Sequence, residues 1–149
     1  SHYATVPYYF YSKKHHPDGL TIREPEDLKK YRINGITGYN YSDYGLAPGD
    51  LSSLAKSHSV LIQQLHRNRC DIVPVWFEVM MGFAAIGTDY LADPDLGSAP
   101  VPGLSPSRFH FVFTKNEEGL ALKQFVDKAL LELRESGRLD ELLRKHVPR

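Results

Sequence analysis

The sequence predicts an α/β domain, because segments with strand patterns and segments with helix patterns alternate along the chain. Residues 108–115 alternate phenylalanine with other side chains, which is typical of a half-buried strand. Residues 118–135 carry leucine, phenylalanine and valine at helical spacing, and Gly137 is placed to end that helix. A last short helix is expected over 139–147, so the expected order is strand, helix, strand, helix, strand, helix.

The first expected strand covers residues 4–14, which are rich in tyrosine and other β-forming residues. Side chains alternate between the two faces of a strand. Tyr8 and Phe10 are therefore expected on one face, and Tyr9 and Tyr11 on the other.

Shorter elements bounded by proline, glycine and serine fill the middle of the chain. They are a short helix over 23–30, a helix capped by Ser57 or Ser59 that ends near 67–69, a buried strand over 70–76, a helix over 77–85, and short extended pieces within 87–106. The helix after the serines is expected to bury four apolar residues: Val60, Leu61, Ile62 and Leu65. Pro74 indicates a strand at a sheet edge or a strand end, because proline cannot donate to the ladder.

The stretch from Arg32 to Ser42 is the strongest candidate for a binding site. It has the pattern of a strand, a tight turn at Gly38 and a helix start, since Asn40 and Ser42 are capping residue types. Free backbone N–H groups and a helix dipole at such a turn would suit a carboxylate or another anion. An ordinary turn between a strand and a helix, without a ligand, is the alternative interpretation.

The composition excludes several classes of protein. Lys plus Arg and Asp plus Glu number 18 each, and this balance argues against nucleic acid or an anionic membrane as the main partner. The sequence shows no apolar run long enough to span a membrane and no signal peptide, although Ser1-His2 leaves a removed signal open. Cys70 is the only cysteine, so neither an intrachain disulfide nor a cysteine metal cluster is expected.

No catalytic or metal-binding pattern is found in the sequence. A paired nucleophile and base, a His-Glu-x-x-His motif and a phosphate-binding loop are all missing. The tandem His15 and His16 lack further ligands at suitable spacing, so they are expected to be solvated loop residues. His66 or His110 would need an acid and a nucleophile brought close by folding. We therefore predict a protein that is not an enzyme and uses no cofactor or metal.

Several segments carry patterns that occur together, in this order, in one protein family. They are Pro7-Tyr8-Tyr9, Pro25-Glu26-Asp27-Leu28 followed by Arg32-Ile33 and Gly38, Leu65-His66-Arg67-Asn68-Arg69-Cys70-Asp71, Phe109 to Lys115, and Ala129-Leu130 followed by Ser136-Gly137-Arg138-Leu139 and Leu142 to His146. Through these segments the chain resembles the bacterial extracellular solute-binding proteins of the amino-acid (family 3) type. The resemblance covers nearly the whole chain.

The resemblance implies a type II periplasmic-binding fold, in which a ligand lies between two α/β lobes. It implies a periplasmic-binding-protein-like lobe with a central mixed sheet flanked by helices. The match begins late, so the opening strands of the first lobe, with the arginine that usually grips the ligand's carboxylate, are expected to lie upstream of residue 1. The chain would be a single partial solute-binding domain. About 12–113 would form the second lobe, and 114–149 would be C-terminal helices that normally complete the first. Stability would then need a rearranged helix packing or a partner subunit, such as a homodimer.

The resemblance also assigns candidate ligand-binding residues. In the family, the turn matching Gly38, Tyr39 and Asn40 offers backbone N–H groups and a hydroxyl side chain, and here Asn40 replaces the usual Thr or Ser. Tyr41, next in the sequence, is included in the expected site. Asp71 and Arg69 belong to the matching signature and are interpreted as structural.

Trp76 stands where many family members carry the acid that binds the ligand's ammonium group. It could stack on a ring or cover a cation, with Glu78 supplying the carboxylate one turn further on. Alternatively, Trp76 is a core residue. Tyr8 and Phe10 lie next to the expected hinge and are candidates for the wall of the cleft, or they pack the lobe.

Three functions follow as hypotheses from this resemblance. The first is a periplasmic ligand-binding lobe for an ABC importer, which binds an amino acid or a related small carboxylate non-covalently and docks on the transporter's membrane subunits. The second is an extracytoplasmic sensor domain that reports ligand occupancy to a signalling module. The third is a degenerate lobe that serves as a protein-interaction module.

Overall fold

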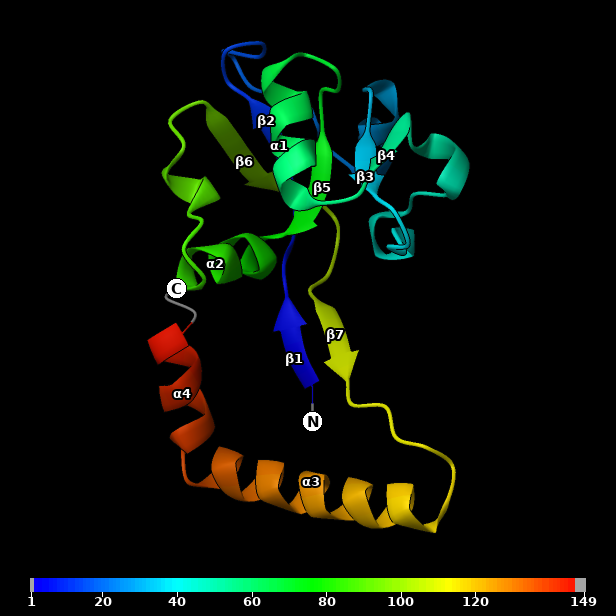
Figure 1. Ribbon diagram of the computed structural model, residues 1–149, viewed down its shortest axis with the longest axis vertical. Helices are drawn as coiled ribbons and strands as arrows, with labels where there is room; N and C mark the ends of the chain where they lie inside the picture. The colour runs from blue at the N-terminus through cyan, green and yellow to red at the C-terminus, as the bar shows by residue number, and fades with distance from the viewer. Residues whose placement is uncertain (1, 147–149) are drawn as a thin grey trace. The chain divides into compact units, whose positions relative to one another are not determined.

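The computed structural model describes residues 2–146, which divide into two compact units of mixed α and β structure (Figure 1). Residues 5–107 form the larger unit, here called the sheet unit. The described parts of 1–4 and 108–149 form the smaller unit, here called the terminal unit. No described helix has the length and apolar character required to cross a membrane.

A mixed sheet organises the sheet unit. Its central strand β2 (Pro7–Ser12) pairs antiparallel with β5 (Val73–Trp76) on one side and with β6 (Leu96–Pro100) on the other. Strand β3 (Asn34–Ile36) pairs parallel with β4 (Ser53–Ala55), and a parallel bridge from Ile33 to Ile72 joins this pair to β5. The spatial order is therefore β4, β3, β5, β2, β6, which confirms the predicted mixed sheet. Strand β5, which carries Pro74, is an edge strand of the three-stranded group β5, β2, β6, but in the whole sheet it lies between β3 and β2.

Strand β2 is buried on both faces, and its side chains divide between the faces as predicted. Phe10 and Tyr8 pack with the helices α1 (His58–His66) and α2 (Phe77–Ala85) in one hydrophobic cluster. Tyr9 and Tyr11 pack in a second cluster on the opposite face. The second cluster also contains Leu28, Ile33, Tyr41, Tyr44, Leu46 and Ile72.

Helix α1 begins and ends where the sequence predicts, but its buried side is narrower. The hydroxyl of Ser57 accepts the Val60 N–H at 3.3 Å, and the chain leaves the helix through Asn68 at a φ of 53°. Leu61, Ile62 and Leu65 are buried, whereas Val60 is 40% exposed. The prediction that Val60 is buried was wrong, because the buried residues His58, Leu61, Ile62 and Leu65 form one stripe at helical spacing and Val60 lies outside it.

The two ends of the sheet unit meet at one edge of the sheet. The first predicted strand, 4–14, is divided into β1 (His2–Thr5) and β2, with Val6 between them. Tyr8 pairs with Pro100 at the end of β6, and the Val101 N–H donates to the Pro7 carbonyl at 3.0 Å. Residues just inside the start and the end of the unit are thus directly hydrogen-bonded.

The short connecting segments are 3-10 turns. The predicted helix over 23–30 is the 3-10 helix η1 (Pro25–Lys30), in which the Asp27 carboxylate accepts the N–H groups of Arg23 and Glu24. Two further turns are η3 (Pro48–Asp50) and η4 (Tyr90–Ala92), and η4 lies within 87–106, where short extended pieces were predicted.

Strand β7 (Ser107–His110) is shorter than the strand predicted over 108–115. Its partner in the described chain is β1, which has four residues, so the alternating pattern beyond His110 has no neighbouring strand to pair with. Phe111 is 66% exposed and Val112 is 93% exposed. The predicted strand was therefore wrong for the part after His110.

The terminal unit also contains the helices α3 (Glu117–Glu135) and α4 (Arg138–His146), close to their predicted bounds. The Asn116 side chain caps α3 by accepting the Gly119 N–H at 2.8 Å, and Gly137 separates the helices at a φ of 71°. Apolar side chains of α3, including Leu120 and Phe125, are more than half exposed. That these helices complete a first lobe stays a prediction.

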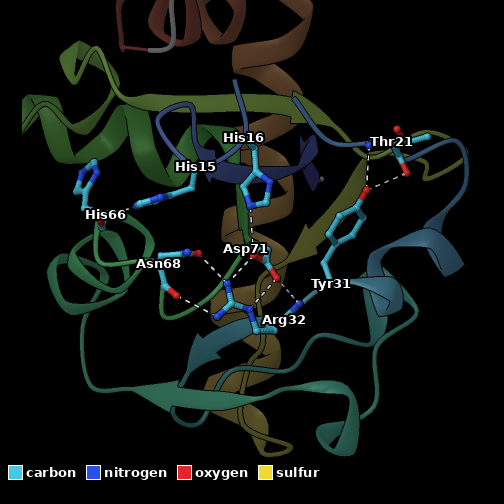
Figure 2. Close-up of polar contacts among 8 residues, drawn as sticks. All are labelled: His15, His16, Thr21, Tyr31, Arg32, His66, Asn68 and Asp71. Carbon is cyan, nitrogen blue, oxygen red and sulfur yellow. Dashed lines mark hydrogen bonds and ion pairs between the residues drawn. The ribbon is translucent and has the colours of Figure 1, made fainter. Parts of the chain in front are cut away.

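A polar network fastens the starts of β3 and β5 together (Figure 2). The Arg32 guanidinium donates to both Asp71 carboxylate oxygens, at 3.0 Å from Nε and 2.8 Å from Nη2, and also to the carbonyl and side chain of Asn68. His16 Nε2 lies 3.2 Å from the same carboxylate. Hydrogen bonds from Arg32 lower the pKa of Asp71 to about 2. Asp71 is thus structural, as expected.

We expect Asp71→Asn to destabilise the protein by about 2 kcal/mol, because the pKa of this carboxyl is well below its ordinary value. A carboxyl with a lowered pKa stabilises the fold when it is ionised, so the difference is fully present above about pH 4 and is lost as the pH falls towards about 2. Urea unfolding at several pH values measures it. The exposed Asp18→Asn is the control, and equal stability of both variants would contradict the prediction.

Gly97 lies opposite Tyr11 across the β2–β6 pair, and a Cβ there would lie 2.7 Å from ring carbons of Tyr11. Gly97→Ala should therefore cost about 1–3 kcal/mol, since the ring has to move out of the second cluster. At Gly82, an exposed position of α2, an added Cβ meets nothing within 4 Å. Gly82→Ala should stabilise by about 0.5–1 kcal/mol, as alanine favours helix. Denaturant unfolding compares the two, and equal effects would contradict the tight contact.

Candidate functional site

The candidate site lies at one edge of the sheet, here called the site edge. Strands β3 and β5 run parallel, so the turn after β3 and the end of β5 reach the same edge. Strand β2 runs antiparallel to β5, and Pro7 at its start pairs with Trp76. The site edge therefore brings together three segments that are far apart in the sequence: 38–41, 76–78 and 6–8.

The turn at Gly38 is exposed and tightly held. Gly38 has a φ of 83°, a conformation that glycine adopts without strain. The Thr37 N–H donates to the Ala55 carbonyl at 2.9 Å, and the Tyr39 N–H donates to the Ile36 carbonyl at 3.2 Å. Within the described chain, the N–H groups of Gly38 and Asn40 engage in no hydrogen bond. They are the backbone donors that this turn offers to a ligand.

The predicted helix start after this turn was wrong. The chain forms only the 3-10 turn η2 (Ser42–Tyr44), which Gly45 ends at a φ of 70°. The Asn40 side chain accepts the Ser42 N–H at 3.0 Å instead of capping a longer helix. A helix dipole therefore does not contribute to anion binding here, and the individual N–H groups are left to do so.

Tyr41 is buried and positions the turn. Its hydroxyl accepts the Ile36 N–H at 2.7 Å, and its ring covers Gly35, where a Cβ would lie 2.8 Å from the ring. Burial raises the pKa of Tyr41, so the side chain is neutral at ordinary pH. The structure places Tyr41 beneath the turn, with Gly38, Tyr39 and Asn40 exposed above it.

An aromatic row connects the turn to the end of β5. Ring centroids are 6.5 Å apart between Tyr39 and Tyr41, 6.2 Å between Tyr41 and Tyr44, and 5.5 Å between Tyr44 and Trp76. Tyr44 is fully buried, and burial strongly raises its pKa. Trp76 is half-buried, so it packs on the second cluster and keeps part of its surface exposed. Sequence reasoning did not single out Tyr44, although the tyrosines at 39, 41 and 44 were the available signal.

Glu78 and Tyr8 also reach the site edge. The Glu78 carboxylate accepts the Val6 N–H, at 3.1 and 3.3 Å from its two oxygens, and so ties the first turn of α2 to the junction of β1 and β2. The Tyr8 ring packs on Phe77 with centroids 4.7 Å apart. Phe10 does not reach this edge, because it pairs with Val73 further along β2 and its side chain is completely buried.

A small apolar pocket of about 110 Å³ opens beside the turn. The residues that line it are Ile36, Gly38, Tyr39, Asn40, Tyr41, Leu46, Ala47, Pro48, Leu51 and Leu54. Tyr39 and Leu54 are each about half exposed, at 48% and 51%. Among the described residues, no group of three or more His, Cys, Asp and Glu side chains could hold a metal ion.

Comparison with known proteins identifies the fold. No family model and no curated sequence matches the chain. Among solved structures, EhuB in complex with hydroxyectoine has a TM-score of 0.74 at 18% identity, over 97% of this chain and 55% of its own. A mutant of ArgBP from T. maritima has a TM-score of 0.69 at 19% identity, over 99% of this chain and 59% of its own. The substrate-binding protein AbpA of an amino acid ABC transporter from Streptococcus pneumoniae, bound to L-arginine, has a TM-score of 0.68 at 25% identity, over 97% and 57%.

The chain thus has the fold of the amino-acid type of solute-binding protein, which confirms the predicted resemblance and the predicted fold class. It spans less than two thirds of the length of these structures. Several of the neighbours are named as substrate-binding proteins, in agreement with the prediction that the chain is not an enzyme.

We expect Tyr41→Phe to destabilise the sheet unit by about 1–2 kcal/mol, because the buried Ile36 N–H loses its acceptor. The ring itself is kept, so the contact with Gly35 remains. Tyr39→Phe, on an exposed ring, is the control and should change the stability by less than about 0.5 kcal/mol. Urea unfolding gives both values, and faster amide exchange at Ile36 localises the effect. Unchanged exchange at Ile36 in Tyr41→Phe would show that the hydroxyl does not hold the turn.

Proposed function

We propose that the chain is the ligand-binding lobe of a solute-binding protein that serves an amino acid ABC importer. It binds an amino acid or a related small carboxylate without covalent chemistry. The observation that supports this most is the exposed turn at Gly38, whose unused N–H groups lie at the same sheet edge as Trp76. The fold of the neighbours supports the same function, since AbpA carries L-arginine.

The ligand's carboxylate binds at the turn in this proposal. The N–H groups of Gly38 and Asn40 donate to it, and charge-assisted bonds of this kind are stronger than bonds between neutral groups. The Asn40 oxygen already accepts the Ser42 N–H, so its amide NH₂ group remains as a further donor. Tyr41 holds the turn from below and does not contact the ligand.

The remainder of the ligand lies against Trp76 and the small apolar pocket. A tryptophan face suits a ring or a cation, so it takes the place of the acid found in related proteins. The pocket beside Tyr39 and Leu54 has room for a short aliphatic group. Glu78 holds Val6 and acts as a positioning residue for the edge, while Tyr8 supports the first turn of α2.

The partners follow from this assignment. The protein acts in the periplasm or outside the cell, and it delivers its ligand to the membrane subunits of the importer. A homodimer, a signalling module as partner, and a role as a protein-interaction module stay predictions.

The proposal is tested by titrating the purified chain with single amino acids and small carboxylates, followed by NMR chemical shifts, which detect weak binding. Asn40→Ala and Trp76→Ala should each weaken binding about tenfold or more, because each removes a direct contact. Gln63→Ala, on the exposed side of α1, is the matched control. A ligand that binds both site variants unchanged would place the site elsewhere, and no binding by any compound would contradict the proposed function.

A further inference from the structure

His66 lies at the edge of the sheet opposite to the site edge. It is the last residue of α1, and its ring sits between two aspartates that precede β6. Nδ1 lies 2.7 Å from the Asp95 carboxylate, and Nε2 lies 2.8 Å from the Asp93 carboxylate. Strand β6 begins at Leu96, which pairs with Ser12 at the end of β2. The ring therefore connects three elements: α1, β2 and β6.

Both carboxylates are held as hydrogen-bond acceptors. Asp95 accepts the Ser12 hydroxyl at 2.8 Å and the Lys14 N–H at 2.6 Å. Burial acts to raise the pKa of Asp95, but these hydrogen bonds and the one from His66 outweigh it, and its pKa is lowered. Asp93 accepts the Asp95 N–H at 2.9 Å.

A neutral imidazole cannot satisfy this arrangement. It has one N–H donor and one nitrogen lone pair, and the lone pair would face an ionised carboxylate that can only accept. The doubly protonated imidazolium donates to both aspartates. Since His66 is the last residue of α1, the carbonyl end of the helix dipole also favours a positive charge there.

We propose that His66 is a proton-controlled clasp, which joins the end of α1 to β2 and β6 in its doubly protonated form and opens when one proton leaves. The clasp does not depend on the proposed ligand site, and it makes the sheet unit more stable in mild acid than in mild base. The second proton gives the ring a second N–H donor, so the imidazolium of the folded state makes two hydrogen bonds to carboxylates that the unfolded chain lacks. The stabilisation is therefore present at low pH and is lost as the pH rises.

The other charged groups around His66 do not change the preference of this site for a doubly protonated ring. The Lys13 ammonium donates to the Pro94 carbonyl at 3.2 Å, and Lys14 contributes its backbone N–H rather than its charge. His15 Nε2 lies 2.9 Å from the His66 carbonyl. A neutral imidazole with its proton on Nε2 can donate this hydrogen bond. Arg67 directly follows the last residue of α1 and, like Lys13, adds positive charge nearby, but among the described residues the charged side chains that contact the ring are the two aspartates. His16 Nε2 pairs with the Asp71 carboxylate at 3.2 Å.

His58 changes the stability with pH in the opposite direction to His66. It therefore has to be replaced before the effect of His66 is measured. Its ring is buried against Phe83 and Tyr39, and Nε2 has no hydrogen-bond partner in the described chain. Burial lowers the pKa of His58, so this residue stabilises the fold when neutral and opposes folding as the pH falls. Phenylalanine suits these aromatic surroundings. His58→Phe is therefore the background variant in which the contribution of His66 to stability is measured.

The test compares thermal unfolding of His58→Phe at about pH 5.5 and about pH 8, on either side of the ordinary histidine range. The midpoint should be lower at the higher pH by about 5 °C. Adding His66→Gln should remove most of this difference, whereas adding His15→Gln should leave it. An equal pH dependence with and without His66 would overturn the clasp.

A second measurement covers the case in which His66→Gln does not fold. Proton–nitrogen NMR of the His58→Phe parent reports whether one or both ring nitrogens of His66 carry a proton. Both should be protonated at about pH 5.5 and one at about pH 8. Amide exchange at Lys14, which donates to Asp95, should become faster over the same range. A ring that carries one proton throughout would overturn the proposal.

Discussion

Burial of strand β2 on both of its faces is the constraint on which the sheet unit depends. Tyr9 and Phe10 are adjacent in the sequence and enter two different hydrophobic clusters, and both flanking strands pair with β2. A strand in this position cannot shift by one residue, because the shift would exchange the side chains of the two clusters. The fixed register of β2 in turn fixes where β5 and β6 begin and end.

The site edge is a consequence of that register. Pro7 opposite Trp76 sets the level at which β5 ends and α2 begins, and Glu78 fixes this corner by holding the Val6 N–H. The turn at Gly38 reaches the same level because β3 runs parallel to β5. The buried tyrosines 41 and 44 fill the space between these two corners, so the exposed groups of the edge rest on a rigid aromatic layer.

Local sequence signals predicted the elements whose ends are decided locally. The Ser57 cap, the bounds of α2, Gly137 and the faces of β2 follow from residue type and spacing, and the structure confirms them. Local sequence signals gave wrong predictions where residues far away in the sequence determine the end of an element. The phenylalanine alternation after His110 finds no strand beside it, and the turn after Asn40 stays short because the side chains of 41 and 44 enter the core. The hydrogen bond from the Val6 N–H to Glu78 joins residues that are 72 positions apart, and no local sequence pattern predicts it.

The hydrogen bond from the Val101 N–H to the Pro7 carbonyl closes the sheet unit on itself. A folded segment whose two ends are adjacent has the geometry of an insertion: it can interrupt a loop of a host protein without pulling the host's chain apart. Residues 5–107 form one compact unit, so both connections of the segment to a host would lie close together. The sheet unit is thus built as a portable module, able to be transplanted or circularly permuted at this junction while its internal order of strands is preserved.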